Sequence, residues 1–321
     1  MVCIYILTIY SIYFIQLTNI YIYIYIYIYI HTYIVLDGMG DLTTIDSEKR
    51  IFYYLGDTSS GTTLLGLNMK DGSVACQGVV PLREIGYVGI AQSIDYDMEN
   101  DNLVISGLAE GNTTGHSVLR TSGCVEGSTN IGKLEHVGIF GDGTFAPMLH
   151  ASAIDSKQQR LFVTLAITKE QDAVGVIDLN GKQPMFTIPA DSFQHTLLGM
   201  QYDTKTESIV GVLPINEAPG GIALQSLKLD GTTPTWKSMT LPTQDYDWLY
   251  GNSGTVSALN IEDGQLYILA GKHPQQPSKG PPKMPEMHLV CIDLLKEKVV
   301  ETPLVSGLPF GVDSLLEMNY V

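Results

Sequence analysis

A short motif that recurs along the chain constrains its fold more than any other feature. In its clearest copy, Ser152-Ala153-Ile154-Asp155 is followed by a polar turn and then by Arg160-Leu161-Phe162-Val163. The apolar and β-branched residues on both sides favour strands, and an aspartate followed by small polar residues is typical of a tight turn. The motif therefore predicts two antiparallel strands joined by a turn that begins at Asp155.

The same pattern occurs four more times. The residues that open the turns of the five copies are Asp46, Asp97, Asp155, Asp203 and Asn260. Successive copies lie about 50 residues apart, a period typical of a repeat architecture. A sixth copy begins at Ser314-Leu315-Leu316-Glu317, close to the last residue of the sequence.

Each copy continues with a variable polar loop, a third strand that ends at a turn, and a weaker fourth strand. Asp71-Gly72, Asn180-Gly181 and Asp230-Gly231 follow three of the predicted third strands. Asp-Gly and Asn-Gly are strong hairpin signals. Four antiparallel strands per repeat are typical of one blade of a β-propeller.

A single blade is a twisted sheet with two apolar faces, which only neighbouring blades can bury. We therefore predict an all-β protein, a β-propeller of four-stranded antiparallel blades. Five blades are clear and a sixth is partial, so we expect a six-bladed ring in which both termini contribute strands to the last blade. The alternative is a chain that has lost its remaining blades.

The aspartates of the turns have a structural explanation. A carboxylate in this position accepts the backbone N–H two residues further on and closes the turn. The run from Asp95 to Asp101 resembles a calcium-binding loop, but Asn100 stands where that loop requires glycine and Ser106 where it requires a bidentate glutamate. We expect a solvated acidic turn there.

The repeat, an aspartate followed by a short polar turn and a Leu-Tyr or Leu-Phe core, resembles the blades of the YVTN/NHL-type β-propeller superfamily. The resemblance extends from residue 41 to about residue 305. It implies the fold and no specific family, because no repeat carries a Trp-Asp pair or a Gly-Gly kelch signature in register.

The first 37 residues differ from the rest of the chain. They are strongly apolar, and residues 20–30 alternate strictly between Ile and Tyr. Three interpretations stay open: a translated TA microsatellite, a signal-anchor, or strands that close the ring. A signal peptide is disfavoured because the segment lacks a basic start and a small-residue cleavage site. We assign residues 38–321 to the propeller domain.

The charge of the chain restricts its partners. With 18 Lys and Arg against 34 Asp and Glu, the formal net charge is −16. Such a surface repels phosphate backbones and anionic lipids, which excludes nucleic acid and restricts membrane contact to an N-terminal anchor. We expect a protein partner or a small polar or cationic ligand.

The cysteines leave the redox compartment open. Cys76 and Cys291 stand in strand-like runs and are expected to be buried, whereas Cys124 in a polar turn is expected to be exposed. The N-glycosylation sequon Asn112-Thr113-Thr114 falls in a predicted loop. The localisation is unknown, and these features favour a secreted or membrane-anchored protein.

The sequence contains no nucleophile elbow, Walker loop or His-Glu-x-x-His motif. In a propeller, the loops before the first strand and between the second and third strands gather at one mouth of the central channel. The candidate ligand-binding residues in these loops are Glu84, Tyr87, Asp142, His150, His195, Asp245, Asp247, Trp248 and Asp313.

These residues and the missing catalytic motifs favour a non-catalytic binding propeller with an acidic channel mouth. The alternative is a calcium-dependent, lactonase-like hydrolase, for which calcium would be the cofactor; otherwise no cofactor is predicted. A quinoprotein-type redox propeller is the third hypothesis, and it is disfavoured because only two tryptophans are available for stacking.

Overall fold

The regular structure of the described residues is β-sheet. The computed structural model describes residues 42–46, 48–58, 61–80, 87–109, 112–125, 127–141, 146–167, 171–181, 186–189, 198–214, 222–229, 234–240, 246–248, 257–260, 263–272 and 286–301. All regular elements in these ranges are strands.

The strands form five antiparallel sheets, called blades 1 to 5 in chain order. Blade 1 contains β1 (Leu42–Asp46), β2 (Ile51–Thr58), β3 (Gly61–Asn68) and β4 (Val74–Val79). Blade 2 contains β5 (Tyr87–Asp97), β6 (Asn102–Ala109), β7 (Asn112–Thr121) and β8 (Glu135–Phe140). Blade 3 contains β9 (Ala146–Asp155), β10 (Arg160–Ile167), β11 (Gln171–Asp178) and β12 (Phe186–Pro189). Blade 4 contains β13 (Leu198–Asp203), β14 (Ser208–Pro214), β15 (Ile222–Lys228) and β16 (Thr235–Thr240). Blade 5 contains β17 (Tyr246–Trp248), β18 (Ser257–Asn260), β19 (Gln265–Lys272), β20 (Glu286–Asp293) and β21 (Lys298–Glu301).

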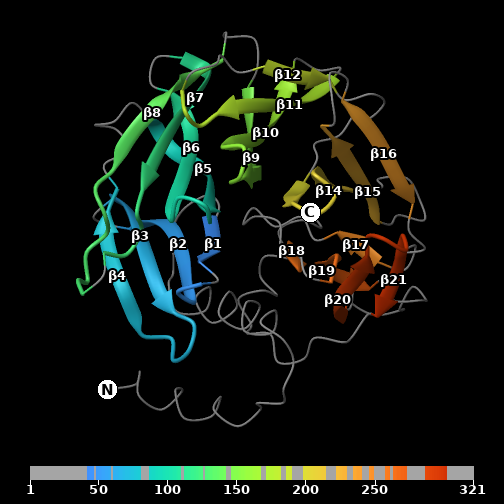
Figure 1. The fold of residues 1–321 in the computed structure, drawn as a ribbon, viewed down its shortest axis with the longest axis horizontal. Coiled ribbons are helices and arrows are strands. Elements are labelled where there is room, and N and C mark those ends of the chain that lie inside the picture. Colours follow the sequence, from blue (N-terminus) through green and yellow to red (C-terminus); the bar gives the residue numbers. More distant parts are fainter. Residues whose placement is uncertain are drawn as a thin grey trace, which may run out of the picture.

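The five blades are arranged around a common centre (Figure 1). The first strand of each blade lies toward this centre and the last strand lies at the rim, and the first strands of successive blades contact one another. The predicted β-propeller is therefore confirmed. The expected sixth blade depends on residues outside the described ranges and stays a prediction.

The core lies between the blades, as the repeat predicts. In β6, Leu103 and Ile105 belong to an apolar cluster shared with blade 1, whereas Val104 belongs to a cluster shared with blade 3. All three side chains are buried. Alternate residues of one strand thus face opposite neighbours, and each such burial stabilises the fold by about 1.5–3 kcal/mol.

The turns that open at the repeat aspartates share one backbone geometry. Each has four residues between the paired ends of two strands, and the fourth has a positive φ. These residues are Arg50 (56°), Asp101 (51°), Gln159 (55°), Glu207 (52°), Gly264 (65°) and, in the last turn of blade 5, Glu297 (52°). Only one of the six is a glycine, so five turns carry a side chain in the left-handed region.

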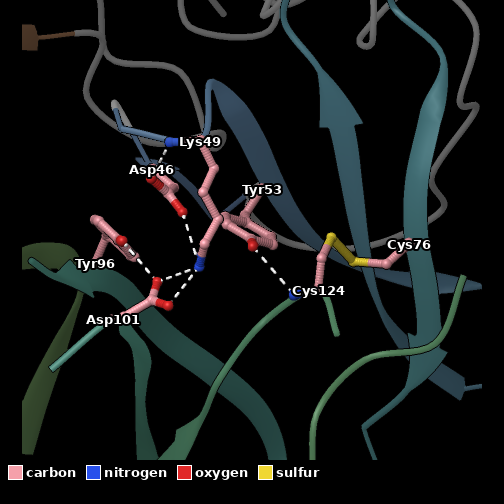
Figure 2. A network of polar contacts seen from close by, with 7 residues as sticks. All are labelled: Asp46, Lys49, Tyr53, Cys76, Tyr96, Asp101 and Cys124. Carbon is pink, nitrogen blue, oxygen red and sulfur yellow. Dashed lines mark hydrogen bonds and ion pairs between the residues drawn. A yellow bond between two sulfur atoms is a disulfide. The ribbon is translucent and has the colours of Figure 1, made fainter. Parts of the chain in front are cut away.

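The connection between β7 and β8 crosses from blade 2 onto blade 1; we call residues 122–134 the strap. Cys124 of the strap forms a disulfide with Cys76 of β4. The backbone N–H of Cys124 donates to the hydroxyl of Tyr53 at 3.1 Å, and Gln77 N–H donates to the carbonyl of Thr129 at 2.8 Å. The strap therefore binds the two blades together both covalently and through hydrogen bonds (Figure 2).

Glycines make room for the strap. A Cβ on Gly66 would lie 2.6 Å from the Cys124 sulfur and 2.8 Å from the Cys76 sulfur. A Cβ on Gly78 would lie 2.4 Å from Cγ1 of Ile131. Blade 1 is thus shaped for the disulfide and for the strap that carries it.

Two expectations from the sequence are wrong here. Cys124 is half-buried and disulfide-bonded, because the strap brings its polar turn onto the neighbouring blade. The sequon does not lie in a loop, since Asn112 is the first residue of β7. The burial of Cys76 and Cys291 is confirmed.

The left-handed turn residues give a matched pair of substitutions. Gly264→Ala should lower the free energy of unfolding by about 1 kcal/mol, because its Cβ meets only ordinary contacts with Leu295 and the cost comes from the positive φ. Glu207→Gly removes the corresponding strain and should be neutral or stabilising. Urea unfolding measures both, and equal destabilisation by the two would contradict this account.

The disulfide gives a second prediction. It closes a loop with a sequence separation of 48, so replacing both Cys76 and Cys124 by Ala should lower the free energy of unfolding by roughly 2–4 kcal/mol. The matched control is Cys291→Ala, which removes a buried thiol that does not take part in the disulfide and opens no loop. Thermal unfolding of the three proteins measures the difference, and equal melting temperatures for the double variant and the wild type would refute it.

Candidate functional site

The structure describes four of the nine predicted site residues, and only their backbone positions. Tyr87 opens β5, His150 lies within β9, and Asp247 and Trp248 form the end of β17. All four therefore lie on innermost strands. The other five lie outside the described residues: Glu84, Asp142, His195, Asp245 and Asp313.

The backbone positions of these four residues show that one prediction from the sequence is wrong. They were expected in loops before the first strands, but they belong to those strands. The innermost strands β5 and β9 extend beyond the residues of the repeated motif. In this extension their pairing with the second strand of the blade is irregular. Alternation of apolar and polar residues fails where pairing is irregular, so the sequence did not mark these segments as strands.

The pairing of the innermost strand changes along blades 2 to 5. In blade 2, Ser93 to Asp97 pair regularly with β6, and the register then shifts twice before Tyr87 pairs with Ala109. In blade 3, Ser152 to Asp155 pair regularly with β10, and the next pair is Pro147 with Leu165. Residues 148–151, His150 among them, thus face a single residue of β10.

Blades 4 and 5 repeat the irregularity. In blade 4 the register shifts between Leu198 and Gln201, at Gly199 with its φ of 52°. In blade 5 the strand is split, because β18 pairs with β19 up to Ser257 and β17 resumes at Trp248. Residues 249–256 thus stand between two strands that pair with consecutive parts of β19.

These irregular segments all lie on the side of the ring away from the aspartate turns. Extra residues in one strand leave backbone N–H and C=O groups outside the ladder and re-aim side chains, which is why bulges are common beside binding sites. We define residues 87–92, 147–151, 198–200 and 246–248 as the channel-mouth half. It is the candidate functional site.

The opposite side of the ring is held by polar contacts between blades. Lys49 of blade 1 binds the carboxylate of Asp101 of blade 2 and lies 3.5 Å from the carboxylate of Asp46 (Figure 2). The hydroxyl of Tyr96 donates to Asp101 at 2.8 Å. Burial, followed by the bond to Asp101, raises the pKa of Tyr96, so this phenol is neutral and acts as a donor.

Other blades are joined in the same way. Gln159 of blade 3 donates to Asp97 of blade 2 at 2.8 Å, and Met98 N–H donates to the Ser156 hydroxyl at 3.1 Å. The pKa of Tyr202 is raised to about 12, mainly because the phenol is buried and secondly because the carboxylate of Asp155 is near. Hydrogen bonds and ion pairs between neighbouring blades therefore hold the aspartate-turn side together.

One carboxyl on an innermost strand was not predicted. Asp95 of β5 accepts a hydrogen bond from the hydroxyl of Ser152 of β9 at 2.7 Å, across the boundary between blades 2 and 3. Burial raises its pKa from 3.8 to about 6, and the Ser152 hydrogen bond opposes this only in part. The sequence does contain a signal for this carboxyl. Asp95 stands two residues before the turn aspartate Asp97, so both side chains lie on the same face of the strand.

A serine–histidine pair in blade 2 is not arranged for catalysis. Ser117 and His136 are hydrogen-bonded at 3.0 Å, but Ser117 is fully buried, so its hydroxyl cannot reach a substrate. Within the described ranges, no three His, Cys, Asp or Glu side chains come together as a metal site would require. In the same ranges there is no helix of the length and apolarity needed to span a membrane.

Comparisons with known proteins place the chain by its fold. No family model and no curated protein matches it. Among solved structures, a putative TolB from Agrobacterium tumefaciens aligns over 82% of this chain and 79% of its own, with 12% identity and a TM-score of 0.51. A hypothetical selenium-binding protein from Sulfolobus tokodaii aligns over 81% and 60%, with 12% identity and a TM-score of 0.50. The periplasmic gluconolactonase of Pseudomonas aeruginosa aligns over 84% and 73%, with 10% identity and a TM-score of 0.47.

The two alignments with TM-scores of 0.51 and 0.50 agree with this fold and, at 12% identity, show nothing narrower. The fold-level resemblance to propellers seen in the sequence is confirmed by the arrangement of the five blades.

The Asp95 carboxyl gives a pH prediction. Its pKa is raised on folding, so the protonated form stabilises the fold below about pH 4, and this contribution is lost as the pH rises through about 6. Asp95→Asn should therefore raise the free energy of unfolding at pH 8 by about 1–2 kcal/mol and have little effect at pH 4. Urea unfolding across pH 4–8 measures this. Glu207→Gln, at an exposed turn, is the control, and a pH-independent difference for Asp95→Asn would contradict the assignment.

Proposed function

We propose that this chain is a non-catalytic binding propeller that recognises a cationic partner, such as a basic segment of another protein, at its channel-mouth half. The observation that carries the proposal is the loss of regular pairing in the innermost strands of blades 2 to 5, always on the same side of the ring. Backbone groups that leave the ladder are available to a ligand.

The scaffold beneath this half supports recognition. The regularly paired half carries buried turn aspartates and hydrogen bonds between blades, so it holds the irregular half in place. A site built on rigid elements keeps its geometry when a ligand binds. This arrangement requires no catalytic group.

The sign of the charge supports a cationic partner. The chain has a formal net charge of −16, and Asp247 and Trp248 stand together at the end of β17. Carboxylates attract ammonium and guanidinium groups through ion pairing, and aromatic rings attract them through cation–π contacts, so both residue types at one mouth suit a cationic ligand. The acids Glu84, Asp142, Asp245 and Asp313 belong to this proposal as predicted members of the mouth.

Tryptophan fluorescence tests the proposal. In the Trp236→Phe variant, Trp248 is the one tryptophan left, because the chain has two. A hexalysine peptide should change its emission at low salt, and Asp247→Asn should weaken that binding about tenfold, equal to about 1.4 kcal/mol. Binding should fall at high salt, since exposed charges are screened.

Hexaglutamate and the Glu207→Gln variant on the aspartate-turn side are the controls. No response to hexalysine at millimolar concentration, or an equal response to hexaglutamate, would refute the proposal. Calorimetry with calcium tests the lactonase-like alternative: we expect neither heat nor a rise in melting temperature, and either one would favour the hydrolase.

A further inference from the structure

The Cys76–Cys124 disulfide implies an oxidising environment during folding. Cys76 is fully buried, and both sulfurs lie so close to Gly66 that any side chain at this position would collide with them. The cross-link is thus built into the interface between β4 and the strap. Such disulfides persist in secreted proteins and in the lumen of the secretory pathway, and they are rare in the cytosol.

A second feature points to the same compartment. Asn112-Thr113-Thr114 is the one Asn-x-Ser/Thr sequon of the sequence. N-linked glycans are attached to such sequons on the surface of secreted proteins. The sequence motif alone is common, so its position in the fold decides whether it can be used.

The backbone around Asn112 suits the attachment of an N-linked glycan. Asn112 pairs with Ala109, so it stands at the tip of the β6–β7 hairpin, where chains run over the surface. The next pair of this ladder is Leu108 with His116, which leaves residues 113–115 without a partner in β6. The pairing of β7 with β8 also begins only at His116. Asn112 therefore stands at the hairpin end of the β6–β7 ladder, and Thr113 and Thr114 lie where the pairing with β6 is interrupted.

We infer that this chain matures in an oxidising secretory compartment, where Asn112 receives an N-linked glycan. The side-chain nitrogen of Asn112 forms a bond to the anomeric carbon of an oligosaccharide donor activated as a diphosphate. The bond from that carbon to the diphosphate breaks, and the amide loses one proton. The Cys76–Cys124 bond forms by exchange with an oxidoreductase disulfide, which takes up two electrons and two protons and becomes a dithiol.

The glycan would lie beside the channel-mouth half. Tyr87 pairs with Ala109, and Ala109 pairs with Asn112, so the three residues form one row across blade 2. Asn112 is two strands farther from the centre than Tyr87. The sugar would therefore border the mouth on the blade 2 side without standing on an innermost strand.

Two arms of one experiment test the inference with the full chain in eukaryotic cells. In the first arm the chain keeps its own N-terminus, and thiols are blocked with a maleimide before lysis. We expect a peptide cross-linked through Cys76 and Cys124, and a mass that falls by one glycan on treatment with peptide N-glycosidase. A chain without a glycan, in which Cys76 and Cys124 are both alkylated, would overturn the assignment to an oxidising secretory compartment.

In the second arm a cleavable signal peptide precedes the full chain, so that entry into the secretory pathway is assured. We expect the glycan on the wild type and on Thr114→Ser, which keeps the sequon, and its complete loss from Asn112→Gln and Thr114→Ala. A wild type without a glycan in this arm would overturn the assignment of Asn112. A glycan that persists in Thr114→Ala would do the same.

Discussion

The fold depends on a buried carboxylate at the first turn of blades 1 to 4. Asp46, Asp97, Asp155 and Asp203 are almost completely removed from solvent. A buried carboxylate is costly unless hydrogen bonds or cations compensate it. Asp46 and Asp155 accept a backbone N–H three residues on and Asp203 accepts one two residues on, while Lys49, Arg160 and Thr206 supply side-chain partners. The turn carboxylate therefore fixes the turn through backbone hydrogen bonds. It can also accept a hydrogen bond from the next blade, as Asp97 does from Gln159.

The first turn divides the innermost strand of blades 2 to 5 into two halves. From the turn, three to five pairs of the first ladder are regular, because the turn sets their register. Contacts such as Gln159 with Asp97 then tie this half to its neighbour. Farther along, the register is no longer imposed, and the innermost strands bulge or split. Polar contacts between the turns of neighbouring blades thus gather on one side of the ring, and the pairing of the innermost strands varies on the other.

The sequence predicts the first half well and the second half poorly, for a physical reason. The Asp155 turn and the strands beside it are encoded by neighbouring residues, so a short motif reveals them. The strap is not: Cys76 and Cys124 are 48 residues apart, and only the packing of blade 2 on blade 1 brings them together. His150 was expected in a loop because the bulge in β9 removes the alternation by which a strand is recognised. Asp95 was missed as a titrating group, since its burial depends on blade 3.

The inner boundary between blades shows how one fold can carry different chemistry. In blades 2 to 4, the residue two before the turn aspartate faces the next blade: Asp95 binds Ser152, and Gln201 lies 3.4 Å from the Ser257 hydroxyl. At the boundary between blades 3 and 4, the corresponding Ala153 packs in an apolar cluster with Met200. A polar pair and an apolar pair fill the same place, because the ring requires only that the side chains meet and leave no unpaired polar group. The repeat therefore fixes where the blades touch, and each boundary is free to differ in polarity and in its response to pH.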